Sequence, residues 1–206
     1  MAALNYRKRI TGMILTAVLG LLAGCGASTV TISGNYPTPT VSKIPLKVAV
    51  YYDDSLRNFV YTEYTEQGQE EYNIESGQSH VDLFNAILPG MFEEVVLINS
   101  LDQARDLAVD AVFEPAIEDF QLALPYKTKL DVYEVWIKYN MRLTTPDGEY
   151  IADWVETSYG KTTIETFRSN EASINEAAVI ALRDLASSFT LKFARVPEIR
   201  DWLASL

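Results

Sequence analysis

The alternation of apolar and polar side chains predicts two long strands in the second half of the chain. Apolar residues occupy every second position from Tyr133 to Leu143, which is the pattern of a strand with one buried face. Residues 145–148 read Thr-Pro-Asp-Gly, a hairpin turn whose glycine supplies a positive φ. We therefore expect residues 150–159 to return antiparallel to the first strand.

Shorter apolar segments predict four more strands. Leu46–Tyr52 alternates, and Phe59–Tyr64 is expected to be its partner strand. Val95–Ile98 is a continuous apolar run, which is typical of a buried strand. Ala111–Leu124 predicts a further strand, in which Pro115 marks an edge or a bulge.

Helical spacing indicates two main helices. Ser79, followed by an acidic residue three positions later, resembles a capping box, and Pro89 is expected to bend or end that helix early. Ser173 opens a second box and the longest predicted helix. The apolar stripe of this second helix is Ile174, Ala178, Ala181, Leu182, Leu185, Phe189 and Phe193.

The order of these elements predicts the fold class. Gln67–Gln78 is polar and is expected to be a loop, Asp102–Val109 a short helix, and Pro197 the start of a last short segment. We predict an α+β fold, a two-layer sandwich in which a mixed, mostly antiparallel sheet is covered on one face by two helices.

The amino-terminal residues have the pattern of an export signal. Basic residues at positions 7–9 precede the apolar segment Ile10–Leu22, and small residues come directly before Cys25. A membrane-spanning helix, the alternative interpretation, needs about 20 apolar residues, more than this segment offers. We expect residues 1–24 to be a signal peptide.

Residues 22–25, Leu-Ala-Gly-Cys, resemble the lipobox of bacterial lipoproteins. The resemblance implies that Cys25 receives a diacylglycerol group, that the leader is cleaved, and that the new amino terminus takes a further acyl chain such as palmitate. Two or three acyl chains on one residue anchor a protein effectively permanently. Gly26 stands where an aspartate retains enterobacterial lipoproteins in the inner membrane, which implies the periplasmic side of the outer membrane.

Composition divides the mature chain into a tether and one domain. Residues 25–45 are rich in Ser, Thr, Gly and Pro and lack apolar periodicity, so we expect a lipidated cysteine followed by a flexible tether spanning about 25 Å. The chain has 206 residues and is 48% hydrophobic, enough for one core of ordinary size. Residues 46–206 are therefore expected to form a single periplasmic domain.

Net charge and the number of cysteines limit the partners and the covalent cross-links that this chain can have. The leader contains three basic residues and no acidic one, so 14 of the 17 basic residues remain against 28 acidic ones, a net charge of −14. Such a body is repelled by nucleic-acid phosphates, and we expect no nucleic acid among its partners. Cys25 is the sole cysteine, so no disulfide forms within the chain.

Reactive side chains are sparse, and we expect no catalytic residue, no metal site and no cofactor. His80 lies beside Ser79 at a predicted helix start, where a helix cap with an exposed imidazole is expected rather than a catalytic triad. Three acids on one predicted strand leave a glycoside hydrolase as an open alternative, although acids that discourage strand aggregation explain them as well. These acids are Glu114, Glu118 and Asp119.

Tyrosine and tryptophan are abundant, with 12 and 3 residues. Trp136 and Trp154 fall on the polar positions of their strands, and Tyr150 follows the predicted turn. Such side chains are favoured where a surface meets a partner. We name Trp136, Trp154 and Tyr150 as candidate partner-binding residues, with cross-strand pairing on a wide sheet as the alternative.

The segment 110–161 carries a second resemblance. It contains Asp110–Ile117, a long strand, the Asp-Gly turn, and Trp154–Gly160. This pattern resembles small envelope lipoproteins with a fold like the amino-terminal domain of TolB, among them lipoproteins that assist outer-membrane assembly, auxiliary lipoproteins of ABC transport and ring-forming lipoproteins of exopolysaccharide export. The resemblance implies a non-enzymatic accessory role and supplies no catalytic residues.

Together, anchor and composition predict an outer-membrane lipoprotein, attached to the inner leaflet through lipid on Cys25, that binds another envelope protein as an assembly or transport accessory. A carrier or sensor of a lipid or glycan, with a cleft between helix and sheet, is the second hypothesis. Assembly of several copies of the chain into a homo-oligomer stays open.

Overall fold

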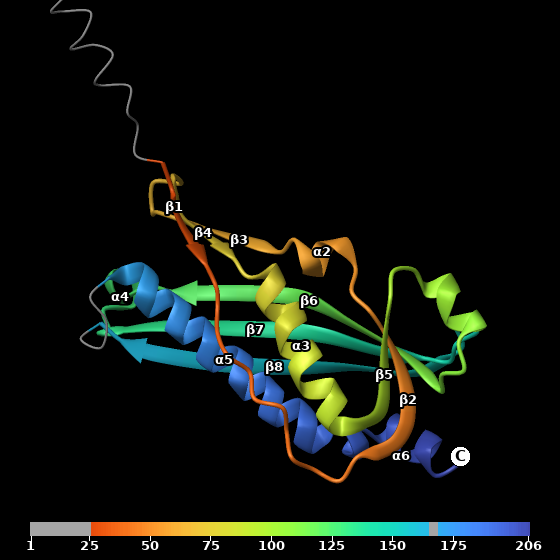
Figure 1. The fold of residues 1–206 in the computed structure, drawn as a ribbon. Coiled ribbons are helices and arrows are strands. Elements are labelled where there is room, and N and C mark those ends of the chain that lie inside the picture. The colour runs from red at the N-terminus through yellow and green to blue at the C-terminus, as the bar shows by residue number, and fades with distance from the viewer. Residues whose placement is uncertain (1–25, 165–168) are drawn as a thin grey trace, which may run out of the picture.

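The computed structural model describes residues 26–164 and 169–206. Two sheets form the body, a large one in the order β5-β2-β6-β7-β8 and a small one in the order β1-β4-β3 (Figure 1). The predicted leader and Cys25 lie outside the described residues. The strands of the large sheet are β2 (Ile44–Tyr51), β5 (Phe92–Ile98), β6 (Ala111–Ala123), β7 (Val132–Thr144) and β8 (Tyr150–Thr163).

Two helices cover one face of the large sheet, α3 (Gly77–Met91) and α5 (Asn170–Lys192) (Figure 1). Strand β2 runs parallel to β5 and β6, while β6, β7 and β8 are antiparallel. This confirms the predicted two-layer α+β sandwich. The short helical segments are α2 (Asp54–Arg57), η1 (Leu101–Asp106), α4 (Pro125–Thr128), η2 (Phe193–Arg195) and α6 (Pro197–Leu203).

The core lies between these helices and the inner face of the large sheet. The alternation in β7 is confirmed, because all six apolar residues at alternate positions from Tyr133 to Leu143 are buried. The stripe predicted for α5 is also buried along its whole length. At the hairpin, Gly148 has a φ of 85° and its N–H donates to the carbonyl of Thr145 at 2.9 Å.

Two predictions concerned the edges of strands, and the structure confirms one of them. Strand β2 pairs with β6 only along residues 111–113, so Pro115 lies on an unpaired edge of β6, as predicted. Strand β5 was expected to be buried, but it is an edge strand and Leu97 is 55% exposed. A continuous apolar run does not distinguish an edge strand from a central one.

The small sheet was not predicted. Strand β3 (Val60–Tyr64) pairs antiparallel with β4 (Glu70–Glu75), not with β2 as expected. Strand β4 falls within the predicted loop, and its two apolar side chains, Tyr72 and Ile74, are its only buried ones. Two apolar residues among charged ones are too short a signal for a period of two.

The predicted flexible tether is wrong for residues 28–45. Strand β1 (Ser28–Thr31) pairs in parallel with β4, and Ile32 and Tyr36 are buried. The N–H of Ser33 donates to the side chain of Asn175 on α5 at 2.8 Å. Composition concealed the strand because the apolar residues Val30 and Ile32 alternate with threonine and serine within a segment rich in turn-forming types.

Helix α5 begins earlier than its predicted cap. Its N-cap is Ser169, whose hydroxyl accepts from the N–H of Ala172 at 3.2 Å. Ser173 lies inside the helix and its hydroxyl donates to the carbonyl of Ser169 at 3.1 Å. The pattern therefore located the helix and misplaced its start by one turn.

Helix α3 shows the same displacement. It begins at Gly77, so Ser79 lies in its first turn, buried, and donates to the carbonyl of Ile32 at 2.6 Å. Pro89 lies inside the helix, which continues to Met91. Pro89 removes only its own N–H hydrogen bond, and just two residues of the helix follow it, so the helix tolerates the proline.

Candidate functional site

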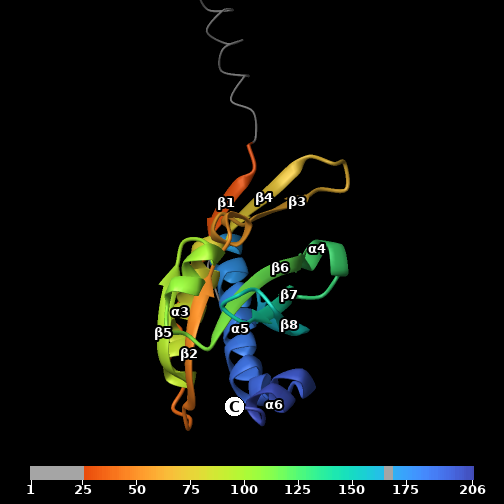
Figure 2. The ribbon, with the colours of Figure 1, turned by 90° about the vertical axis from the view of Figure 1, so that its right-hand side faces the viewer.

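The outer face of β7 and β8 carries an aromatic pair, and neither α3 nor α5 covers this face (Figure 2). Trp136 of β7 is 39% exposed and stands opposite Tyr159 of β8, with ring centroids 5.1 Å apart. The Tyr159 hydroxyl donates to Glu134 at 2.6 Å, and this hydrogen bond raises the pKa of Tyr159 to about 12. The tyrosine is neutral at physiological pH and is held in place beside the tryptophan.

A cavity of about 290 Å³ adjoins this pair. Lys138 at its rim forms an ion pair with Glu118 at 2.6 Å, and Gln121 donates to Asp119 at 2.7 Å. Tryptophan is enriched at protein interfaces, where it commonly lies beside hydrogen-bonding groups. The lining residues are Asp119, Gln121, Trp136, Ile137, Lys138, Thr157 and Ser158.

Tyr150, the second candidate, lies elsewhere. It is the first residue of β8 and is 64% exposed, and its hydroxyl accepts from the N–H of Asp153 at 3.2 Å. Along the strand it is nine residues from Tyr159, roughly 30 Å. The structure therefore does not bring Tyr150 and Trp136 into one site.

Trp154, the third candidate, faces the helices, and its prediction as an outward-facing residue is wrong. Its indole lies 6.2 Å from the rings of Phe113 and Phe189 and 5.9 Å from that of Phe193, between ring centroids. The inner face of β8 also carries polar side chains such as Glu156, which is buried under α5. Polar residues on the buried face reversed the apparent phase of the alternation.

His80 is fully buried, which corrects the expected exposed imidazole. Its Nε2 lies 3.0 Å from the hydroxyl oxygen of Ser76, and its Nδ1 lies 2.6 Å from that of Tyr139. Burial lowers the pKa of His80 to about 3, so the ring is neutral. Because α3 starts before Ser79, the histidine falls on the sheet-facing side, where its hydrogen bond with Tyr139 of β7 joins helix and sheet.

The acids proposed for hydrolysis have separate partners. Glu114 stands opposite Arg142 in the register of β6 and β7, and burial raises the pKa of that carboxyl. Glu118 is paired with Lys138, and Asp119 accepts from Gln121. Within residues 26–164 and 169–206 there is no group of three or more His, Cys, Asp or Glu that could hold a metal ion.

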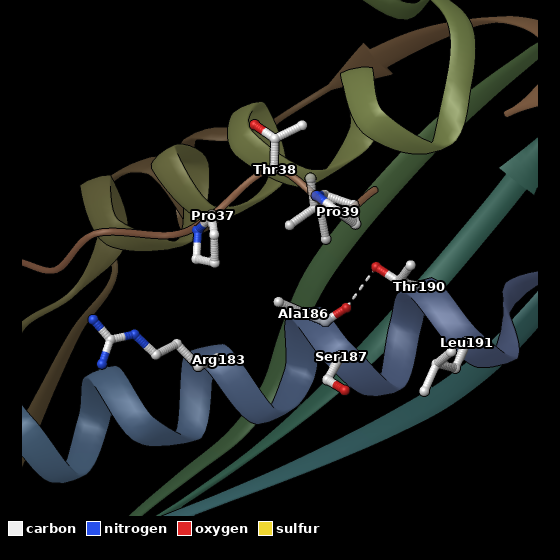
Figure 3. A pocket seen from close by; sticks show the side chains of 9 residues that line it. Pro37, Thr38, Pro39, Arg183, Ala186, Ser187, Thr190 and Leu191 are labelled. Carbon is white, nitrogen blue, oxygen red and sulfur yellow. Dashed lines mark hydrogen bonds between the residues drawn. The ribbon is translucent and has the colours of Figure 1, made fainter. Parts of the chain in front are cut away.

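A groove on the helical side was not foreseen from the sequence (Figure 3). It lies between the segment Pro37–Pro39 and the helices α3 and α5 and has a volume of about 330 Å³. Arg183 borders it, and its guanidinium donates to the carbonyl of Asn35 at 3.2 and 3.3 Å. The sequence analysis missed the groove because it assigned one wall to a tether. Its lining is Pro37, Thr38, Pro39, Ile87, Arg183, Ala186, Ser187, Thr190 and Leu191.

Segment 37–39 is part of the folded body. A Cβ added at Gly90 of α3 would lie 2.6 Å from the carbonyl oxygen of Pro39, so this segment and the helix are in close contact.

Among the helices that the structure describes, none is long and apolar enough to cross a membrane.

Comparison with known proteins gives a fold and no family. No family model and no curated protein matches the chain. A solved protein of family DUF330 from Xanthomonas campestris is similar over 80% of this chain and 91% of its own, with a TM-score of 0.52 and 13% identity. At this identity the similarity shows the fold alone.

Other solved structures with weaker similarity include lipoproteins of Gram-negative bacteria. A minor lipoprotein from Acinetobacter baumannii aligns with 75% of this chain and 94% of its own, at 13% identity and a TM-score of 0.39. An uncharacterized lipoprotein B from Nitrosomonas europaea aligns with 82% of this chain and 97% of its own, at 12% identity and a TM-score of 0.42.

Proposed function

We propose that this chain is a lipoprotein on the periplasmic side of the outer membrane, held by acyl chains on Cys25, that serves as a non-enzymatic accessory of an envelope complex. The lipobox at residues 22–25 supports the anchor, and Gly26 supports the choice of membrane. The resemblance of segment 110–161 to lipoproteins with a fold like the amino-terminal domain of TolB supports the accessory role, and it stays a prediction.

The state of the reactive side chains favours binding over catalysis. His80 is buried and neutral, and Glu118 is paired with a lysine. A general base needs access to a substrate and a pKa near the working pH, and His80 has neither.

The observation that carries the proposed binding role is the exposed Trp136, paired with the half-buried Tyr159 on the open sheet face. Tryptophan and tyrosine supply a large share of the binding energy at protein interfaces, because they bury much apolar area with few rotatable bonds. We assign this face to contact with another envelope protein.

A cross-linking pull-down from solubilised envelopes tests this role. The wild-type chain is compared with Trp136→Ala and with a control, Leu97→Ala, which removes an exposed side chain from the edge strand β5, three strands away from β7. We expect the wild type and the control to retain the same envelope protein and Trp136→Ala to retain about 30-fold less, the effect of losing about 2 kcal/mol. Equal retention by all three chains, or retention of no envelope protein, contradicts the proposal.

The groove favours the second candidate function, a carrier for a lipid or a glycan. Its volume of about 330 Å³ lies at the lower end of the range of small-molecule sites, and prolines, Ile87 and Leu191 make much of its lining apolar. Native mass spectrometry of the chain purified in mild detergent would show a bound lipid or glycan, which Ala186→Trp should displace by filling the groove. A single species of unliganded mass would exclude this candidate.

A further inference from the structure

The chain enters the folded body at one end of the molecule (Figure 1). Ser28, the first residue of β1, pairs with Tyr72 of β4, and its hydroxyl donates to Glu171 of α5 at 3.4 Å. Only two residues separate Ser28 from Cys25, and three residues of chain span at most about 11 Å. A lipid on Cys25 is therefore held close to this end, without the length of a tether.

Exposed apolar side chains gather at the same end. We call Tyr64, Tyr126, Leu130 and Ile164 the membrane-end patch, and they are 49%, 52%, 55% and 41% exposed. They come from β3, from α4, from the turn after α4 and from the residue after β8. Segments far apart in the sequence thus bring together side chains that water solvates poorly.

Hydrogen bonds and strand pairing connect the patch to the start of β1. The hydroxyl of Tyr126 donates to Glu71, whose neighbour Tyr72 pairs with Ser28. The ammonium of Lys127 donates to the carbonyl of Tyr64, which joins the hairpin of the small sheet to α4.

The other half of the patch is joined in the same way. The N–H of Ile164 donates to the carbonyl of Asp131 at 3.2 Å, so Leu130 and Ile164 lie on neighbouring segments. The four side chains are therefore held by defined backbone positions around the point where the chain from Cys25 enters.

We infer that the membrane-end patch rests on the bilayer surface and orients the body on the membrane, an inference that rests on the proposed acylation of Cys25. Tyrosine is enriched at membrane interfaces because its ring is apolar and its hydroxyl polar, and leucine and isoleucine gain by leaving water. The short connection to Cys25 keeps the patch within reach of the bilayer. The exposed apolar side chains make contact with the bilayer favourable.

The charges around the patch favour a zwitterionic bilayer over an anionic one. Exposed acids at this end include Glu66, Glu70 and Asp131, against the exposed bases Lys129 and Lys161. Anionic headgroups would not attract this surface, so the contact depends on apolar insertion into a zwitterionic bilayer.

This orientation would also bring the proposed binding face close to the membrane. Tyr159 is five residues from Ile164, so the pair of Trp136 and Tyr159 lies within roughly 17 Å of the patch along β8. Tyr150 and the hairpin turn lie at the far end of the same strand. A partner that binds at Trp136 would therefore do so near the membrane surface.

Fluorescence quenching by nitroxide-labelled lipid tests the inference. The acylated chain is reconstituted into phosphatidylcholine vesicles after Leu130→Cys or Ile164→Cys, and the new thiol is labelled with a small fluorophore, since the thiol of Cys25 is acylated. The control is Leu97→Cys, because Leu97 is 55% exposed like Leu130 and lies on β5, away from the patch.

We expect quenching at positions 130 and 164 to exceed that at position 97 by about two-fold or more, since interfacial groups insert about 5 to 10 Å. If the chain floats with vesicles and all three positions are quenched equally, the patch inference is wrong while the anchor stands. If the wild-type chain does not float with vesicles, the acyl anchor itself is absent and both proposals are overturned.

Discussion

The two faces of the large sheet carry tryptophans in different states, although both looked alike in the sequence. Trp154 on β8 contacts Phe113, Phe189 and Phe193 beneath the helices, whereas Trp136 on the neighbouring strand pairs with Tyr159 on the open face. The inner tryptophan serves packing and the outer one is available to a partner. The difference shows that the local alternation of apolar and polar residues does not reveal which face of the sheet a tryptophan occupies. The packing of the strand against the covering helix determines it.

The largest expected effect is on the free energy of unfolding, which should respond differently to replacement of the two tryptophans. Trp154→Ala should lower the free energy of unfolding by about 3 kcal/mol, because it leaves a cavity among three aromatic rings. Trp136→Ala, its matched control, should change it by less than about 1 kcal/mol. Urea unfolding of residues 26–206 measures both, and equal losses would mean that the two faces are not distinct.

A second prediction concerns the contact of β8 with α5. A Cβ at Gly160 would lie 2.1 Å from the carbonyl oxygen of Ala177 and 2.4 Å from the amide nitrogen of Ala181, so Gly160→Ala must push strand and helix apart. We expect a loss of about 2 to 3 kcal/mol in the same unfolding experiment. Thr157→Ala, on the exposed side of the same strand, is the control, and it should be nearly neutral. An unchanged midpoint for Gly160→Ala would show that the helix does not lie where the structure has it.

The buried histidine predicts a dependence of stability on pH. Below about pH 6.5 the unfolded state takes up a proton that folded His80, with its pKa lowered to about 3, does not bind, so stability falls as the pH falls. Between pH 7 and pH 5 the wild type should lose about 2 kcal/mol more than His80→Gln, which does not titrate. Unfolding curves at the two pH values give this difference, and identical losses would place the imidazole in water.

The smallest effect is expected on the outer face. Lys138 and Glu118 form an exposed ion pair, so Glu118→Gln should alter stability by less than about 0.5 kcal/mol and leave the fold unchanged. Thermal unfolding at low and high salt checks this. A loss above 1 kcal/mol would indicate that the outer face contributes to the core.

The sequence predicted the long elements well and the short ones poorly, for a physical reason. Strand β7 and helix α5 repeat their apolar pattern over many residues, so the period is unambiguous. Strands β1 and β4 bury two or fewer large apolar side chains each, and their pairing with one another is visible only in three dimensions. Helix starts were misplaced by a few residues because the capping box fits Ser79 and Ser173, whereas the observed N-caps, Ser76 and Ser169, lack an acidic residue three positions later.

The candidate surface was predicted in part. Trp136 was named and lies exposed on an open face, but its companion Tyr159 follows from the register of β7 and β8, which no local pattern supplies. The groove beside Pro37–Pro39 and the membrane-end patch both depend on segment 28–45 folding onto the body. Composition had assigned that segment to a flexible connection, so neither feature was accessible from the sequence.

The central claim is that acyl chains on Cys25 hold this body on the outer membrane. Intact-mass spectrometry and membrane fractionation of the wild type and of Cys25→Ser, expressed in a Gram-negative host, test it most directly. We predict that the wild type begins at residue 25, carries the added mass of a diacylglyceryl group and at least one acyl chain, and sediments with outer membranes. The serine variant should lack this mass and leave that fraction. A variant that is still processed, still membrane-bound and equal in mass to the unacylated sequence would contradict the account.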